Sequence, residues 1–161
     1  MRTTTYRQHR TVQRDETSLR NAANRQEGAD FEKRLNGYHE ELRLTGKALI
    51  YKTNPDIRMT GPGRAAIVGR GPCDYFGFLS NGRVVMFDAK SRAQKAFSIG
   101  DDMQHQITWM LGIAAQGHTA GLLVYWKDHG QVCWHPVQSF DKRVRMEDGT
   151  PCAGVDWLET V

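Results

Sequence analysis

Asp74, Asp88 and Lys90 have the types and spacing that metal-dependent hydrolysis requires. Asp88 and Lys90 flank a single alanine, and Asp74 lies in the apolar run before them. Hydrolysis of a phosphodiester needs a divalent cation that polarises the phosphate and activates water, and magnesium takes oxygen ligands, chiefly carboxylates. A nearby ammonium group can stabilise the developing charge. If the three side chains meet, they favour cleavage of a phosphodiester at a metal.

The positions of these residues predict a β-hairpin. Residues 73–79 and 83–90 are strand-like runs, and Ser80-Asn81-Gly82 between them is a strong hairpin signal. Because side chains alternate along a strand, Asp88 and Lys90 share one face of the second run.

The length of the turn decides whether Asp74 joins them. A two-residue loop of Asn81 and Gly82 would pair Asp74 with Ala89 and point it away from Asp88. A three-residue loop with Gly82 in the left-handed conformation pairs Asp74 with Asp88. We predict the three-residue loop, or an equivalent bulge elsewhere in the hairpin.

A surface ion pair is the alternative interpretation of two acids and a lysine, and on spacing alone it is the commoner one. The apolar surroundings favour a metal site, because unpaired carboxylates are costly to bury among apolar side chains and a bound cation offsets that cost. The apolar neighbours are Tyr75, Phe76, Phe78, Val84, Val85, Met86 and Phe87.

The elements around the hairpin indicate a mixed sheet flanked by helices. Apolar residues at helical spacing over 31–42 predict a helix that ends near Gly46, and a strand follows over 47–52. Residues 53–72 hold three prolines and four glycines, which argues against regular structure through most of the segment and predicts a basic loop, a protruding hairpin or a short stalk. The order helix, three strands, helix, strands is typical of an α/β fold.

The second half of the chain predicts a further helix and two strands. Asp101 or Asp102 is expected to cap the helix, and residues 120–126 and 131–135 predict a buried strand and an edge strand. The buried stripe expected on the helix is Met103, Ile107, Met110, Leu111 and Ala114.

Composition limits the class of protein. The 161 residues fit one domain, which we expect over 26–161. No run of eighteen apolar residues exists, so we expect a cytoplasmic protein without membrane contact, and the three scattered cysteines are expected to be reduced. Residues 1–25 carry six arginines against two acids and predict a basic, partly disordered arm, either a solvated tail or a phosphate-gripping segment.

Four blocks stand in order along the chain: Gly28-x-x-x-Glu32, Cys73-Asp74-Tyr75-Phe76-Gly77, Phe87-Asp88-Ala89-Lys90 and His105-Gln106-Ile107. Together they resemble the RecU-type Holliday junction resolvases of the PD-(D/E)xK nuclease superfamily. The resemblance covers about residues 28–126 and implies a restriction-endonuclease-like core, a mixed central sheet flanked by helices.

The resemblance implies roles for five residues. Asp74 and Asp88 would bind Mg²⁺, for which Mn²⁺ could substitute, and Lys90 would orient the attacking water or stabilise the transition state. Gln106 would complete the metal site, and Glu32 resembles the first-helix glutamate of archaeal-type resolvases, a metal-binding and catalytic position. The alternative for Glu32 is a solvent-facing helix residue without a role at the site, and a similar alternative applies to Gln106.

Two positions depart from the family pattern. Asp88 stands where the family usually has glutamate, which shortens the ligand, and Pro72 stands where the pattern has a threonine ligand. The segment 53–72 is also shorter than the usual stalk, so entry into a junction is left open. His105 is expected to pack or to contact phosphate, because no second histidine stands at metal-ligand spacing.

The function implied by the resemblance is resolution of four-way DNA junctions through paired symmetric nicks. Two symmetric nicks imply a two-fold homodimer with one site per chain. Basic residues would grip phosphates with little base readout. They are Arg58, Arg64, Arg70, Arg92 and Lys95 around the branch, with Arg20 and Arg25 in the arm.

Three other functions stay open. The nearest is another nuclease of the same fold that acts on flaps, nicks or duplex DNA. A DNA-binding protein that keeps the fold without catalysis is a second, against which the intact Asp74, Asp88 and Lys90 argue. An RNA-associated protein is the weakest, because no aromatic platform motif appears.

Overall fold

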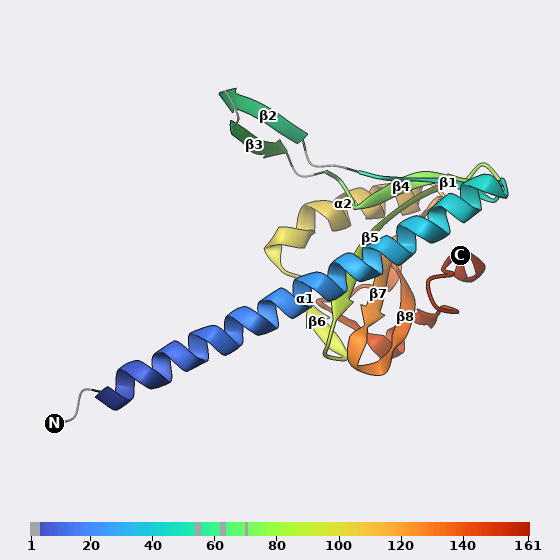
Figure 1. Cartoon of the computed structure of the whole chain (residues 1–161). Helices are drawn as coiled ribbons and strands as arrows, with labels where there is room; N and C mark the ends of the chain where they lie inside the picture. The colour runs from blue at the N-terminus through green and yellow to red at the C-terminus, as the bar shows by residue number, and fades with distance from the viewer. Residues whose placement is uncertain (1–3, 54–55, 62–63, 70) are drawn as a thin grey trace.

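The computed structural model describes the backbone of residues 4–53, 56–61, 64–69 and 71–161, and the side chains of residues 18–53 and 71–161. Its centre is a six-stranded sheet flanked by two helices, α1 (Thr4–Leu44) and α2 (Asp101–Ala115), on opposite faces (Figure 1). In spatial order the strands are β1 (Ala48–Lys52), β4 (Tyr75–Leu79), β5 (Val84–Arg92), β7 (Thr119–Trp126), β8 (Gln131–Pro136) and β10 (Thr150–Pro151).

The sheet is mixed, as the sequence predicted. Strands β1, β4 and β5 form antiparallel pairs, and β7 and β8 are also antiparallel. Strands β5 and β7 are parallel, because α2 provides the crossover between them. Strand β8 pairs with both β7 and the two-residue β10, so the prediction that it is an edge strand was wrong.

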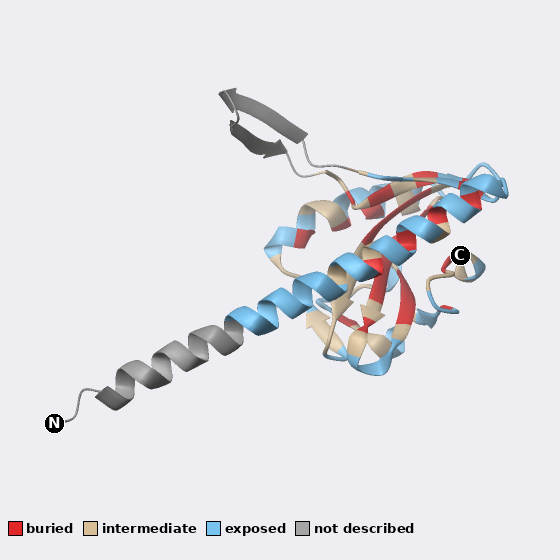
Figure 2. Ribbon diagram, viewed as in Figure 1, coloured by how far each residue is buried: buried red, intermediate tan, exposed pale blue. Residues whose placement is uncertain are grey.

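Each face of the sheet has its own apolar core, because side chains alternate along each strand. Helix α1 contributes Phe31, Leu35 and Leu42 to the cluster on one face. Helix α2 contributes Met103, Ile107 and Met110 to the cluster on the other face. The buried residues of β5 and β7 run between the two helices (Figure 2). The hairpin that carries Asp88 therefore lies at the centre of the domain.

Helix α1 is longer than the sequence predicted. It begins at Thr4, whereas apolar residues at helical spacing marked only residues 31–42, and its first half extends beyond the sheet (Figure 1). Residues 18–27 are exposed (Figure 2). Residues 4–27 contain neither glycine nor proline, so nothing in the sequence interrupts the helix even though no apolar stripe marks it.

The end of α1 matches the prediction. The backbone N–H of Lys47 donates to the Leu42 carbonyl at 3.0 Å, and Gly46 has a φ of 69°. A left-handed glycine after the last turn satisfies the free carbonyls of the helix. It also directs the chain into β1.

Residues 53–72 contain a hairpin that stands away from the sheet (Figure 1). Strands β2 (Asp56–Gly61) and β3 (Arg64–Gly69) pair antiparallel with two register shifts. Of the open alternatives, the protruding hairpin is confirmed. The expectation of little regular structure was wrong, because the three prolines fall outside the two strands.

Helix α2 differs from the prediction in two details. Its N-cap is Gly100, while Asp101 and Asp102 lie in the first turn, where acidic side chains favour the positive end of the helix dipole. Leu111 is exposed, because Met103, Ile107 and Met110 already define the buried stripe and Leu111 lies on its edge.

The remaining elements are short. Strands β6 (Ala96–Ser98) and β9 (Arg143–Arg145) pair antiparallel. The 3-10 turns are η1 (Lys127–His129), η2 (Val137–Ser139), η3 (Met146–Asp148) and η4 (Leu158–Thr160). All three cysteines are buried free thiols, as expected. Within the described residues, no helix has the length and apolar character needed to cross a membrane.

Candidate active site

The turn between β4 and β5 has the predicted three-residue form. Tyr75 pairs with Phe87. The N–H of Leu79 bonds to the carbonyl of Arg83 at 2.8 Å, so residues 80–82 form the loop. Gly82 has a φ of 81°, the left-handed conformation on which the prediction depended. The same register carried one residue further places Asp74 opposite Asp88.

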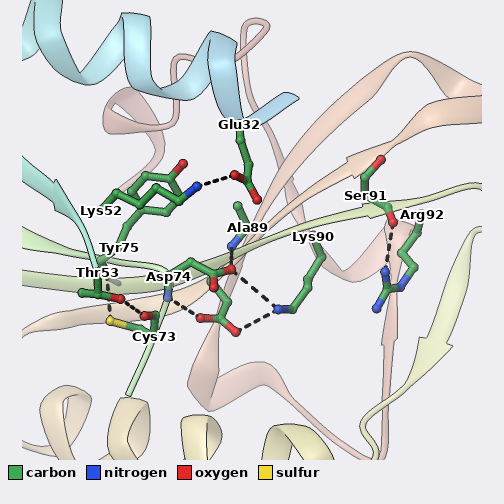
Figure 3. A network of polar contacts seen from close by, with 11 residues as sticks. Glu32, Lys52, Thr53, Cys73, Asp74, Tyr75, Ala89, Lys90, Ser91 and Arg92 are labelled. Atoms are coloured by element: carbon green, nitrogen blue, oxygen red, sulfur yellow. Dashed lines mark hydrogen bonds and ion pairs between the residues drawn. The ribbon is translucent and has the colours of Figure 1, made fainter. Parts of the chain in front are cut away.

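Backbone hydrogen bonds hold the two carboxylates in place (Figure 3). The N–H of Asp74 donates to Asp88 Oδ1 at 2.7 Å. The N–H of Ala89 donates to Asp74 Oδ2 at 3.1 Å. Each carboxylate is thus bonded to the strand that carries the other, which fixes their relative orientation.

Lys90 lies beside both acids (Figure 3). Its Nζ is 3.0 Å from Asp88 Oδ2 and 3.6 Å from Asp74 Oδ2. The Lys90 side chain is only 20% exposed, so this contact differs from a surface ion pair. The structure brings together the three residues that the sequence singled out.

Burial shapes the electrostatics of the pair. The Asp88 side chain is 0% exposed, and its Oδ2 has the Lys90 ammonium nearby but no hydrogen bond of suitable geometry among the described residues. Burial first, and the Asp88 charge second, raise the pKa of the Asp74 carboxyl above its ordinary value, while Lys90 and the Ala89 N–H oppose the rise. One ammonium thus compensates one buried and one half-buried carboxylate only in part.

The donor set fits a hard divalent cation. Asp74 and Asp88 supply carboxylate oxygens, and the unbonded Oδ2 of Asp88 has spare capacity for a ligand. Among the described residues, no three His, Cys, Asp or Glu side chains gather as a metal cluster. Magnesium usually keeps several waters and binds through one or two carboxylates plus substrate phosphate, so a pair suits it.

Glu32 lies on α1 near this site but has its own partner. Lys52 Nζ contacts Glu32 Oε2 at 2.5 Å, and both side chains are 43% exposed (Figure 3). The Glu32 charge contributes, as the smallest cause, to the raised pKa of Asp74. Glu32 therefore stands close enough to influence Asp74 electrostatically, while its carboxylate is turned to Lys52.

Gln106 and His105 lie on α2 and are half-buried. In the described part of the chain, Gln106 makes no hydrogen bond to either aspartate. His105 Nε2 is buried and has no hydrogen-bond partner among the described residues.

Lys52 and Thr53 belong to the surroundings of the site, although the sequence did not single them out. The N–H of Thr53 donates to the Asp74 carbonyl at 2.8 Å, and its hydroxyl bonds to the Cys73 carbonyl. These bonds anchor the end of β1 beside Asp74. Lys52 and Thr53 lie beside the site because β1 pairs with β4. No local sequence motif specifies that pairing, so the sequence alone did not reveal the two residues.

The basic residues expected to bind DNA are spread over the molecule. Arg20 and Arg25 are exposed on α1, and Lys95 is exposed beyond β5. Arg92 is half-buried with its guanidinium 4.7 Å from the Phe97 ring, and burial lowers its pKa. The side chains of Arg58 and Arg64, and the whole of Arg70, lie outside the described residues.

Comparison with known proteins agrees with the sequence resemblance. The chain matches the family RecU, Recombination protein U, over residues 26–152. A similar solved structure is Hjc of Archaeoglobus fulgidus, described as a Holliday junction resolvase from an archaeal hyperthermophile; it is 17% identical, with a TM-score of 0.50 over 80% of this chain and 98% of that chain. No curated protein matches significantly.

The family match and the structural match support different conclusions. At 17% identity the likeness to Hjc shows the fold, which is restriction-endonuclease-like as predicted. The family match spans most of the 161 residues and includes Asp74, Asp88 and Lys90. The chain belongs to the RecU family.

Proposed function

We propose that this protein is a nuclease that resolves four-way DNA junctions by metal-dependent hydrolysis. The observation that carries the proposal is the Asp74–Asp88 pair with Lys90 Nζ at 3.0 Å from Asp88 Oδ2. Membership of the RecU family supports the substrate, and Hjc, whose fold it shares, is described as a Holliday junction resolvase. DNA as the substrate also agrees with a cytoplasmic location.

In this proposal, Asp74 and Asp88 hold one Mg²⁺, with Mn²⁺ as a substitute. When bound, the cation polarises the scissile phosphate and activates water. The N–H groups of Asp74 and Ala89 fix the carboxylates beforehand, which lowers the reorganisation that metal binding requires. Lys90 supplies a fixed positive charge for the charge that develops on the phosphate.

Glu32 and Gln106 are proposed as further contributors from the two helices. Glu32 adds negative charge beside Asp74 and would act once DNA or metal draws it from Lys52. Gln106 would reach the metal or a phosphate from α2. In the described structure Glu32 pairs with Lys52, and Gln106 makes no hydrogen bond to either aspartate.

Junction resolution requires a homodimer in this account, because two symmetric nicks need two sites related by a two-fold axis. Exposed apolar side chains on the β1–β4 face offer area for such a contact. Leu49 is 43% exposed, Tyr51 56% and Phe78 48%. Leu49 and Phe78 are register partners on adjacent strands, so they form one patch. Sedimentation equilibrium of the free protein tests the dimer.

The test of the function uses an end-labelled four-way junction and a linear duplex of the same sequence, each incubated with magnesium. Paired symmetric nicks confined to the junction support resolution. Cutting of flaps, nicks or duplex instead would assign another nuclease activity of the same fold. Binding to the junction without any cutting would leave a non-catalytic DNA-binding protein.

A further inference from the structure

A cavity of about 430 Å³ lies where α1 passes the end of β5. Its wall from α1 consists of Asn21, Asn24 and Arg25, which are spaced by three and four residues and so share one face of the helix. The opposite wall includes Ser91 and Arg92 at the end of β5 and Lys127 of η1. Ala93 completes the lining, and the other six side chains are polar or basic.

Two polar groups that line this cavity, the Asn24 amide nitrogen and the Ser91 hydroxyl, have no hydrogen-bond acceptor or partner among the described residues. Lys127 Nζ is held by Asn24 Oδ1 at 2.6 Å and by Glu27 Oε2 at 2.5 Å. Because the Asn24 oxygen accepts from Lys127, its amide N–H groups are left to donate; among the described residues they have no acceptor. Ser91 Oγ is buried and has no hydrogen-bond partner in the described part of the molecule.

The charge of the cavity is positive. Lys127 is compensated by Glu27. Within the residues whose side chains are described, Arg25 and Arg92 have no carboxylate within ion-pair distance. Arg92 is also half-buried, where a cation costs more than on the surface, and Asp102 offsets that cost only from beyond ion-pair distance. An anion with several acceptor oxygens fits both the charge and the donors.

The cavity lies beside the candidate active site. Ser91 directly follows Lys90 in β5 (Figure 3). On α1, Arg25 precedes Glu32 by seven residues, two turns along one face, or about 10 Å at 1.5 Å per residue. The axial rise of one DNA strand is about 3.4 Å per nucleotide and neighbouring phosphates are further apart than that, so the cavity lies within roughly three nucleotides of a phosphate at the two aspartates.

We infer that this cavity binds one backbone phosphate of the DNA, within about three nucleotides of the scissile phosphate. The inference rests on the proposed function for the position of the scissile phosphate. Arg25 and the Asn24 amide contact the phosphate, and the contact sets the register of the strand across Asp74 and Asp88.

The test measures binding rather than cutting, with Ca²⁺ in place of Mg²⁺. Junctions that carry a single uncharged methylphosphonate, placed in turn at each position on both sides of the expected nick, are titrated with the wild-type protein and with Arg25→Ala. Arg83→Ala is the matched control, because Arg83 is exposed at the far end of the β4–β5 hairpin. The slope of log K against log salt is measured for each protein.

The wild type and Arg83→Ala should lose about tenfold in affinity at one position within roughly three nucleotides of the nick. Arg25→Ala should bind unmodified DNA about tenfold more weakly, lose the sensitivity at that position and show a salt slope lower by about one. An Arg25→Ala profile and slope equal to those of the wild type, or no DNA binding by the wild type, overturns the inference. Failure of cleavage with this binding pattern intact overturns only the proposed function.

Discussion

The backbone N–H of Asp74 donates to Oδ1 of Asp88 at 2.7 Å, so one acidic residue orients the carboxylate of the other. The bond leaves Asp88 Oδ2 facing Lys90 at 3.0 Å. A buried carboxylate with one bonded and one available oxygen is suited to a metal that approaches from the available side.

The Asp88→Asn variant should keep the hydrogen bond from the Asp74 N–H but lose cleavage of the junction. The amide oxygen can still accept from the Asp74 N–H, but the negative charge that attracts the metal is gone. We expect junction cleavage to fall by at least about 10²-fold in single-turnover assays, as for the loss of one transition-state interaction. The melting temperature should stay within about 4 °C of the parent, the shift that ~1 kcal/mol produces.

Asp141→Asn is the control for Asp88→Asn, because Asp141 is exposed and distant in sequence. It should cut at the parental rate. Parental activity in Asp88→Asn would remove the proposed mechanism altogether.

Lys90→Met should lower cleavage by about 10²-fold and shift the pH profile. The ammonium holds down the pKa of Asp74, so its loss should raise that pKa further and move the acidic limb of the rate profile to higher pH. Lys90→Arg should restore the position of that limb because it retains the charge, and Lys142→Met, an exposed control, should change neither quantity. An unshifted limb in Lys90→Met would mean that Lys90 does not act on the carboxylates.

Magnesium should stabilise the protein in a pH-dependent way. The folded pKa of Asp74 is raised above its ordinary 3.8, so its ionisation costs stability and the free energy of unfolding falls as pH rises through the folded pKa. A bound cation stabilises the ionised Asp74 carboxylate and so offsets this loss of stability. Magnesium should therefore raise the melting temperature at about pH 7.5 and have little effect near pH 4. Equal shifts at the two pH values, or an undiminished shift in Asp74→Asn, would contradict a metal at this carboxylate.

Glu32→Gln separates a role in the reaction from a role in the fold. The Glu32–Lys52 pair is 43% exposed on both sides, and such pairs contribute about 0–1 kcal/mol, so stability should change little. Cleavage should fall by about tenfold, or ~1.4 kcal/mol of transition-state stabilisation. Glu41→Gln, an exposed change on the same helix, should cut normally. A normal rate in Glu32→Gln would reduce Glu32 to a surface partner of Lys52.

The sequence predicted the central hairpin because its register depends on local chemistry. Gly82 permits the left-handed residue that a three-residue turn requires, and that turn aligns Asp74 with Asp88. The mixed sheet and the helix end at Gly46 were also readable, because periodicity and glycine mark them locally.

Other features could not be read from local pattern. The bond between Thr53 and Asp74 depends on the pairing of β1 with β4, and the contact of Lys52 with Glu32 depends on how α1 lies over the sheet. The early start of α1 carries no apolar stripe, so periodicity gave no signal for it. Long-range packing decides such features.

Cleavage of a four-way junction is the most direct test of the central claim. The wild-type protein, incubated with magnesium and an end-labelled junction, should introduce paired nicks at symmetric positions in two opposing strands. It should leave the matched linear duplex intact, and Asp88→Asn should leave both substrates intact. Equal cutting of the duplex, or cutting of the junction that persists without a divalent cation, would contradict the account.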